Sequence, residues 1–311
     1  MKTILSHLLR SRSSFHKSRD AVNFMLCKDR CPHVTHTYLF NAMLVKKDGR
    51  LLSTTSNMVD ESIKGEKPER VKVSPLPTGK ILVLGGNGFV GSHICREAIE
   101  YGLAVCSLSR SGRPSLCDSW ADSESMIWLR GDLLSPDSMK DALSGVTSVI
   151  SCIGGFGSNS HMYRINGTAN INAVRAAADQ GVERFVYISA ADFGLVNYIL
   201  QGYYEGKRAT ERELLAKYPH GGVILRPGFI HGTRRVGRIK LPLSVIGAPL
   251  EMLLQYAKPL THIPLVGPLF IPPVKVTSVA KVAVKAAIDP SVPSGILDVY
   301  KIRKYVTELS A

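Results

Sequence analysis

A glycine-rich turn between a strand and a helix constrains the fold of this chain more than any other feature. The strand is Lys80–Leu84 (KILVL), which is apolar after its first residue, as expected for a parallel strand buried on both faces. Glycines follow at positions 85, 88 and 91, and Ser92–Tyr101 has a helical pattern. This order of strand, GxxGxxG turn and helix is typical of the first unit of a dinucleotide-binding fold.

Each glycine has its own steric role in such a turn. The first permits the tight turn, the second lets the backbone approach a diphosphate, and the third lets the helix pack closely on the strand. The helix N-terminus then presents unpaired N–H groups and the positive end of its dipole to the phosphates. A glycine turn without a ligand is the alternative. The residues expected to line the phosphate site are Gly85, Asn87, Gly88, Phe89, Val90 and Gly91.

Strand and helix patterns continue to alternate beyond this unit. A long helix is expected from Asn166 to about Gln180. Five further strands are expected at Leu103–Leu108, Met126–Leu129, Val146–Ser151, Arg184–Ala190 and Gly222–Leu225. This alternation predicts an α/β protein with a doubly wound parallel sheet, the Rossmann architecture, over residues 79–228. Residues 229–311 are expected to form a small substrate-side lobe integrated with that domain.

The segments after the strands indicate which cofactor is preferred. Sites that prefer NAD place an acidic residue about 20 residues past the glycines, where it holds the ribose hydroxyls. Arg110 and Arg113 stand there instead, and a guanidinium fork suits a 2′-phosphate, so NADP(H) is expected over NAD(H). Solvated loop arginines are the alternative. Asp132 is a candidate acceptor for the adenine amino group or a turn residue, and Gly154 lets the backbone approach the cofactor.

Tyr203 and Lys207 are the candidate catalytic pair. Their spacing of four places both on one face of a helix. A neighbouring ammonium group and a positively charged nicotinamide would lower the phenol's pKa from its usual value of about 10, which suits acid–base work on a carbonyl–alcohol pair. Ser189, at the carboxyl end of the fifth strand, is expected to hydrogen-bond the same substrate oxygen. An ordinary helix surface is the alternative for the pair.

Together these motifs resemble the extended and atypical short-chain dehydrogenase/reductases. The segments that carry the resemblance are GGNGFVG (85–91), RGDL (130–133), INGTANI (165–171), VYISA (186–190), YYEGK (203–207) and LRPGFIHG (225–232). The resemblance implies Ser189, Tyr203 and Lys207 as the catalytic positions, and Asn166 as the residue that holds a water near the lysine. One departure is Ser278, which stands where the family has an aspartate that acts as a structural cap.

The chain is most similar to the branch that contains the Rossmann accessory subunit of respiratory complex I and a fungal subunit of the coenzyme Q synthesis complex. That resemblance implies a role in or beside ubiquinone biosynthesis, with a small hydrophobic or quinone-like substrate and carbonyl–alcohol oxidoreductase chemistry. The alternative is a non-catalytic NADPH-binding subunit of a protein complex at the inner membrane. Intact motif residues leave the choice between enzyme and subunit open.

Residues 1–52 carry half of the chain's excess positive charge. They hold ten basic and three acidic residues, a net charge of +7 within a total of +14. The first 19 residues lack acids and are rich in Arg, Ser and Leu, which is typical of organelle transit peptides. Because Arg50-Leu51-Leu52-Ser53 resembles a matrix-processing site, residues 1–52 are interpreted as a mitochondrial presequence that directs the protein to the matrix or the matrix face of the inner membrane, and residues 53–78 as a linker. The alternatives are a chloroplast transit peptide and a disordered or nucleic-acid-binding basic tail.

Basic and apolar residues adjoin in the C-terminal lobe. Arg234, Arg235, Arg238 and Lys240 precede the mostly apolar stretch Leu241–Ala257. This arrangement suits peripheral contact with an anionic inner membrane, a pocket for a hydrophobic substrate or a partner subunit, and core packing is a further alternative. Its uncharged runs are broken by prolines and too short for a transmembrane span.

Two function classes are not expected. The remaining charge of +7 beyond residue 52 comes without clustered aromatic residues, so no nucleic-acid partner is predicted. The six cysteines show no CxxC pairing, so no metal site is predicted either.

Overall fold

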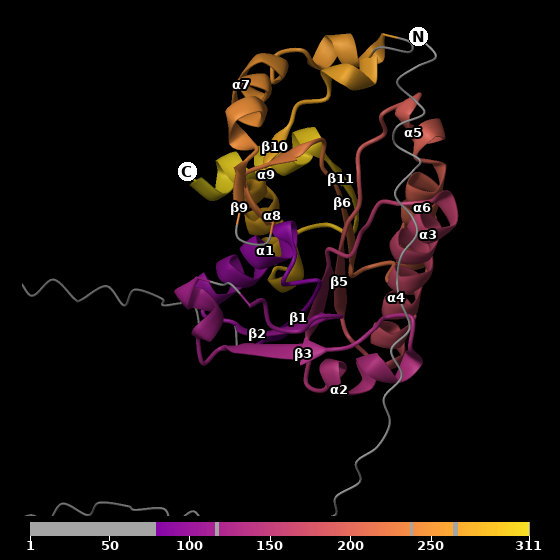
Figure 1. Cartoon of the computed structure of the whole chain (residues 1–311), viewed down its shortest axis with the longest axis vertical. Coiled ribbons are helices and arrows are strands. Elements are labelled where there is room, and N and C mark those ends of the chain that lie inside the picture. The colour runs from indigo at the N-terminus through magenta and orange to yellow at the C-terminus, as the bar shows by residue number, and fades with distance from the viewer. Residues whose placement is uncertain (1–78, 116–117, 237–238, 264–266, 311) are drawn as a thin grey trace, which may run out of the picture. The chain divides into compact units, whose positions relative to one another are not determined.

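A computed structural model of the chain describes residues 79–115, 118–236, 239–263 and 267–310. The expected presequence and linker, residues 1–78, lie outside the described residues. Within those ranges a seven-stranded parallel sheet forms the centre of the structure, in the order β11-β6-β5-β4-β1-β2-β3 (Figure 1). Its strands are β1 (Lys80–Leu84), β2 (Ala104–Ser109), β3 (Met126–Arg130), β4 (Ser148–Ser151), β5 (Arg184–Ile188), β6 (Gly222–Arg226) and β11 (Gly295–Asp298).

Strand order reverses between β1 and β4. Leu82 of β1 lies opposite Cys106 of β2 on one side and Val149 of β4 on the other, all in parallel register. The chain runs outward from β1 through β2 to β3, then returns to β4 and runs outward the other way. In open α/β sheets such a switch point creates the ligand-binding crevice at the carboxyl ends of the strands. The doubly wound parallel sheet expected from the sequence is thus confirmed.

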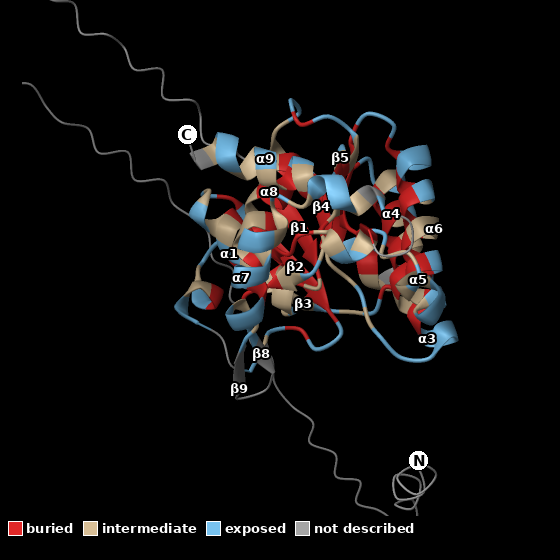
Figure 2. Cartoon of the chain, turned by 90° about the horizontal axis from the view of Figure 1, so that it is seen from above, coloured by how far each residue is buried: buried red, intermediate tan, exposed pale blue. Residues whose placement is uncertain are grey.

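Helices cover both faces of the sheet. Figure 1 shows α1 and α8 on one side and α3, α4 and α6 on the other. The strands between them are buried on both faces, and Figure 2 shows this core along β1 and β4. The α-helices are α1 (Phe89–Glu100), α2 (Lys140–Leu143), α3 (Asn159–Tyr163), α4 (Ala169–Asp179), α5 (Val196–Ile199), α6 (Gln201–Lys217), α7 (Ser244–Leu254), α8 (Val276–Ile288) and α9 (Val299–Ser310).

The long helix in the middle of the chain begins earlier than the sequence pattern indicates. It was expected to open at Asn166, whereas α3 begins at Asn159, where the Ser158 hydroxyl accepts a hydrogen bond from the His161 N–H. A single π-helical turn, Arg164–Thr168, then joins α3 to α4. Asn166 therefore lies inside a helix, in a wider turn of the kind that often marks functional sites.

Residues after 228 contribute to both the sheet and a peripheral lobe. They supply the edge strand β11 and the helix α8, which packs on the sheet beside α1. The lobe itself contains two small sheets and two short helical turns. These are the parallel pair β7 (Ile230–His231) and β10 (Val274–Lys275), the hairpin β8 (Thr233–Val236) and β9 (Ile239–Pro242), and the turns η4 (Lys258–His262) and η5 (Gly267–Phe270).

Among the described residues, every helix is too short or too polar to cross a bilayer.

Candidate functional site

The turn between β1 and α1 has the geometry that its glycines require. Gly85 has a φ of +86°, a left-handed conformation that favours glycine. A Cβ atom at Gly91 would lie 2.1 Å from the Gly85 carbonyl oxygen, so only glycine lets α1 approach β1 this closely. Gly86 is equally confined, because a Cβ there would lie 2.3 Å from the Ser107 hydroxyl. The loop at residues 85–91, called the glycine loop below, is thus sterically fixed.

The N-terminus of α1 is open to an anion. Gly88 is its N-cap residue and supplies no side-chain hydrogen bond, and the first turn contains no acidic residue. The amides of Phe89, Val90 and Gly91 therefore stand at the positive end of a 12-residue helix without a side-chain cap. This arrangement fits the diphosphate of a dinucleotide.

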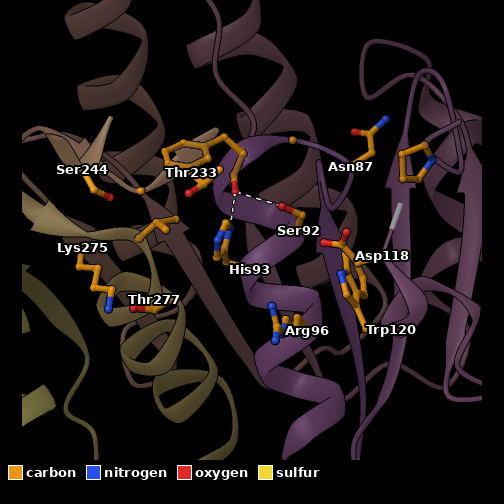
Figure 3. Close-up of a pocket in the computed structure, with 15 residues that line it drawn as sticks. Asn87, Ser92, His93, Arg96, Asp118, Trp120, Thr233, Ser244, Lys275 and Thr277 are labelled. Carbon is orange, nitrogen blue, oxygen red and sulfur yellow. Dashed lines mark hydrogen bonds between the residues drawn. The ribbon is translucent and has the colours of Figure 1, made fainter. Parts of the chain in front are cut away.

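A cavity of about 450 Å³ extends from the glycine loop along the exposed side of α1 (Figure 3). Asn87 lies at its loop end, and Ser92 and His93 of α1 lie between Lys275 and Asp118. The Ser92 hydroxyl and the His93 ring nitrogen Nδ1 both bond the Phe89 carbonyl oxygen, at 3.1 and 2.9 Å. These bonds hold the first turn of α1 and leave its amides unblocked.

The candidate residues for a 2′-phosphate lie at the carboxyl end of β2. Asn87 Nδ2 donates to the Ser111 hydroxyl at 2.6 Å and so ties this segment to the glycine loop. Arg110 is exposed, and its carbonyl oxygen accepts a hydrogen bond from Arg130 Nε at 3.1 Å, which brings a second guanidinium beside it. Arg113 is ion-paired with Asp122 and directed toward that partner.

Asp132 acts as a turn residue after β3. Its Oδ1 atom accepts a hydrogen bond from the Leu134 N–H at 3.1 Å, and its own N–H donates to the Ser138 hydroxyl. Of the two roles that the sequence left open for Asp132, the structure shows the turn role. The adenine contact stays a prediction for its second carboxylate oxygen.

Lys207 is placed by an unusually close pair of helices. A Cβ at Gly206 of α6 would lie 2.8 Å from the Gly167 backbone nitrogen, and one at Gly167 would lie 2.9 Å from the Gly206 Cα. Glycine at both positions lets α6 press against the π-helical turn. Lys207 is 3% exposed as a result, and its Nζ donates to the Ile188 carbonyl oxygen at 2.8 Å. Burial lowers the pKa of Lys207 to about 7.

Tyr203 lies one turn before Lys207 on the same face of α6. Its ring centroid is 5.3 Å from the Lys207 Nζ, and the exposed Phe156 ring stacks on it with centroids 5.0 Å apart and planes at 10°. Burial raises the pKa of Tyr203 above its usual value, although the charge of Arg208 lowers it in part. In this arrangement the phenol is a proton donor, and it is a weak one.

Ser189 is bound into an ion-pair network. Its hydroxyl donates to Glu211 Oε1 at 2.5 Å, and Arg208 Nη1 reaches the same hydroxyl at 3.3 Å. Arg226 holds Glu211 with both its Nε and Nη2 atoms. Burial raises the pKa of Glu211, but the hydrogen bonds from Arg226 and Ser189 outweigh it and leave that pKa below its usual value. Glu211 is therefore an anion, and it accepts the hydrogen bond of the Ser189 hydroxyl.

Asn166 and Lys207 are linked by the phenol of Tyr187. The Lys207 Nζ lies 3.4 Å from the Tyr187 hydroxyl, which donates to the Asn166 carbonyl oxygen at 3.1 Å. The same carbonyl accepts from Thr210, and the Asn166 side chain bonds both backbone groups of Gly155. The resemblance implies a water between this asparagine and the lysine, and here the Tyr187 hydroxyl bridges them.

Residues 85–242 match the NAD(P)H-binding family. This match covers half of the chain and begins at the first glycine of the glycine loop. The protein is an atypical short-chain dehydrogenase/reductase of that family.

Similar members of the family come from different compartments. An uncharacterized chloroplastic protein of Arabidopsis thaliana is 43% identical over 77% of this chain and 81% of its own length. MIOREX complex component 2 of Saccharomyces cerevisiae is 38% identical over 24% of this chain and 28% of its own. The mitochondrial protein fmp-52 of Neurospora crassa is 27% identical over 51% of this chain and 67% of its own. The similar proteins thus include chloroplastic and mitochondrial ones.

A solved short-chain dehydrogenase-type enzyme shares the fold. The Bordetella bronchiseptica enzyme WbmG, in complex with NAD and UDP, has a TM-score of 0.52 at 15% identity and covers 73% of this chain and 74% of its own. At that identity the likeness concerns the fold alone.

The structure of this reductase-family protein groups the predicted site residues into two sets. Tyr203, Lys207, Asn166 and the exposed backbone of Gly154 lie together, with a Cβ at Gly154 reaching within 3.9 Å of the Lys207 Nζ. The residues of the glycine loop form the other set with Arg110. Ser189 is next to Ile188, whose carbonyl binds Lys207, but its hydroxyl is directed to Glu211.

Several functional residues escaped the sequence analysis. These are Arg208, Glu211 and Arg226 of the ion-pair network, Tyr187 beside Lys207, Arg130 beside Arg110, and Gly86 of the glycine loop. One signal was available, because Glu211 follows Lys207 by four residues and so continues the Tyr203–Lys207 face of α6.

Proposed function

We propose that this protein is an organellar NADP(H)-binding subunit of a membrane-associated complex, and that it binds the dinucleotide without turning it over. Quinone biosynthesis is the process we propose for that complex. The observation that carries the proposal is the hydrogen bond from the Ser189 hydroxyl to Glu211. It directs the serine's proton to a buried carboxylate rather than to a substrate oxygen.

Cofactor binding is supported by the steric design of the glycine loop. The missing side chain at Gly88, where a Cβ would meet only the Gly85 carbonyl oxygen at 3.2 Å, and the uncapped first turn of α1 suit a diphosphate. Arg110 follows β2, and Arg130 Nε bonds its carbonyl oxygen, so two arginines stand where the ribose of a dinucleotide is expected; the proposed preference for NADP(H) over NAD(H) rests on them.

Weak acid–base chemistry supports a binding role over a catalytic one. An oxidoreductase of this type needs a phenol with a lowered pKa and a serine free to donate to the reacting oxygen. Burial raises the pKa of Tyr203 instead, and the Ser189 hydroxyl already donates its hydrogen bond to Glu211. Burial lowers the pKa of Lys207 to about 7, which disfavours the ammonium form that would activate the phenol.

Organelle location and complex membership are supported by the relatives. They include a chloroplastic protein, a mitochondrial protein and a complex component. The basic, acid-poor residues 1–52 support import into the mitochondrial matrix, and the 43% identical chloroplastic relative supports the plastid as the second candidate. Import of the full chain into isolated mitochondria and chloroplasts, scored by protease protection, separates the two.

Carbonyl–alcohol oxidoreduction on a hydrophobic or quinone-like substrate is the second candidate function. It is favoured by Tyr203 and Lys207 lying one helical turn apart beside the exposed backbone of Gly154. A bound nicotinamide would supply or accept the hydride, and Tyr203 would hold the proton at the substrate oxygen.

A comparison of quinone intermediates tests the proposal. Cells that lack the protein are compared with cells that carry Tyr203→Phe or the wild type, and NADPH binding of each purified protein is measured by fluorescence. We expect Tyr203→Phe to bind NADPH and to restore the wild-type intermediates. Accumulation of the same intermediate in the null and Tyr203→Phe cells would show that the protein is an enzyme and overturn the binding role.

A further inference from the structure

Helix α7 turns an apolar face toward solvent. Val245, Ile246, Met252 and Leu253 are each between 67% and 75% exposed, and Figure 2 shows the helix largely as exposed. A surface helix of a soluble protein normally places polar residues on its outer face. A contiguous apolar face of this kind indicates an interaction surface.

The only acid of α7 is on its inner face. Glu251 Oε2 lies 2.6 Å from Nε2 of the buried His231, and its Oε1 accepts a hydrogen bond from Arg303 of α9 at 3.3 Å. Gly247 presses against His231, where a Cβ would lie 2.2 Å from the histidine Cβ. These contacts fix the rotation of α7 on β7 and α9. Because Glu251 is the only charged residue of α7 and lies on the inner face, the outer face is uncharged.

The segment that contains this apolar helix is basic. The segment from residue 232 to 258 contains five basic residues and a single acid, Glu251, which is withdrawn. Arg234 of the β8–β9 hairpin is exposed and precedes the helix. Lys258 follows it, with its Nζ over the Tyr300 ring, and Tyr256 is 81% exposed between them. Positive charge and a tyrosine at the rim of an apolar face complement the headgroup layer of an anionic bilayer.

We propose that α7 is a membrane-contact helix, which inserts its apolar face among the lipids of an anionic membrane while Arg234 and Lys258 bind the headgroups. The helix has 11 residues and is too short to span a bilayer, so it lies in the plane of the surface. The proposal goes beyond the proposed function by naming the element and the lipid class. Ser244, at the start of α7, lines the cavity beside the glycine loop, so NADPH binding is followed in every variant.

Vesicle co-sedimentation of the full chain tests this proposal. The probes are vesicles of phosphatidylcholine with and without phosphatidylglycerol. We expect the wild type to bind the anionic vesicles and to bind the neutral ones weakly. The double variant Ile246→Ser/Leu253→Ser should lose about tenfold or more in affinity for the anionic vesicles. Arg234→Glu should lose about fivefold or more on the anionic vesicles only.

Helix α6 provides matched controls, because it covers the face of the sheet opposite α8 (Figure 1). Leu215→Ser and Arg212→Glu make the same changes at exposed positions there, and both should bind vesicles as the wild type does. Thermal unfolding and NADPH binding are measured for every variant, which separates a failure of this contact from a failure of the dinucleotide site.

Three results would overturn the proposal. The first is a wild type that binds neither vesicle, and the second is an equal loss in the α6 controls. The third is a wild type that is dimeric by light scattering and becomes monomeric in the α7 double variant without any vesicle binding. That result would assign the face to a second copy of the chain.

Discussion

The glycine loop and the Ser189–Tyr203–Lys207 cluster differ in how their residues are held. In the glycine loop, Gly91 is required by a neighbour six residues away, the Gly85 carbonyl. In the cluster, Ser189 is bound by Glu211 on another element, and Glu211 is held by Arg226 on a third. The geometry of the loop is thus determined by steric contacts within a few residues. The geometry of the cluster depends on contacts between segments that are distant in the sequence.

This difference separates binding from turnover. A local loop retains its geometry wherever the motif occurs between a strand and a helix, and in that context it indicates a dinucleotide site. A motif such as YxxxK specifies only the spacing of two side chains, and the partners of the third residue decide what the cluster does. Here those partners hold the Ser189 hydroxyl on Glu211, although the spacing of Tyr203 and Lys207 is intact.

The largest effect is expected from Gly91→Ala. Its Cβ would lie 2.1 Å from a backbone oxygen that cannot move independently of Gly85, so α1 must shift away from β1. We expect a free energy of unfolding lower by about 3 kcal/mol and no measurable NADPH binding. Denaturant unfolding and fluorescence titration measure the two. Gly155→Ala is the control, because its Cβ would meet Ile165 at an ordinary 3.5 Å and should cost less than about 1 kcal/mol. NADPH binding by Gly91→Ala equal to that of the wild type would show that the backbone of the glycine loop is less constrained than the side chains of the Ser189–Tyr203–Lys207 cluster.

The next effect concerns Glu211→Gln. The change removes the anion that Arg208 and Arg226 share, and we expect the free energy of unfolding to fall by about 2 kcal/mol, since both guanidinium groups are partly exposed. NADPH binding should stay unchanged, because the glycine loop lies on another element. A loss of NADPH binding equal to the loss of stability would show that the two regions are coupled.

The same variant gives a pH test. The pKa of Glu211 is lower in the folded protein than its usual value of 4.5, so its stabilising contribution is fully present above about pH 4.5. It is lost as pH falls through the folded-state pKa. Wild type and Glu211→Gln should therefore differ most above pH 4.5 and converge in acid, which urea unfolding at a series of pH values measures. A constant difference down to pH 2 would show that the carboxylate is not the stabilising species.

The sequence predicted the parts of the molecule that local sterics and periodicity determine. The apolar strand at Lys80–Leu84, the glycine spacing and the alternation of strands with helices led to the parallel sheet, and it is confirmed. The start of the mid-chain helix was wrong, because the Ser158 cap opens it at Asn159 and the π-helical turn carries Asn166 inside it. Neither feature changes the hydrophobic period on which that prediction rested.

The ion-pair network was outside the reach of such patterns, apart from the position of Glu211 on the Tyr203–Lys207 face of α6. Nothing in the spacing of Ser189, Glu211 and Arg226 indicates that they meet, since Ser189 follows β5 while Glu211 and Arg226 lie on α6 and β6. The sequence analysis also missed the Tyr187 phenol beside Lys207, because a tyrosine in an apolar strand is normally interpreted as a core residue. Long-range pairing of polar side chains needs the fold before it can be inferred.

The smallest effect concerns cofactor preference and compares two arginines within the dinucleotide site. Arg110 is exposed beside Arg130, whereas Arg113 is ion-paired with Asp122 and directed away. We expect Arg110→Glu to weaken NADPH binding by about tenfold and to leave NADH binding within about twofold, since only NADPH has a 2′-phosphate to lose a charge-assisted hydrogen bond. Arg113→Glu should change the ratio of the two affinities less. Paired titrations of each variant with NADPH and NADH measure that ratio. If Arg113→Glu changes it more than Arg110→Glu does, the phosphate is bound on the Asp122 side, and the ion pair must open to receive it.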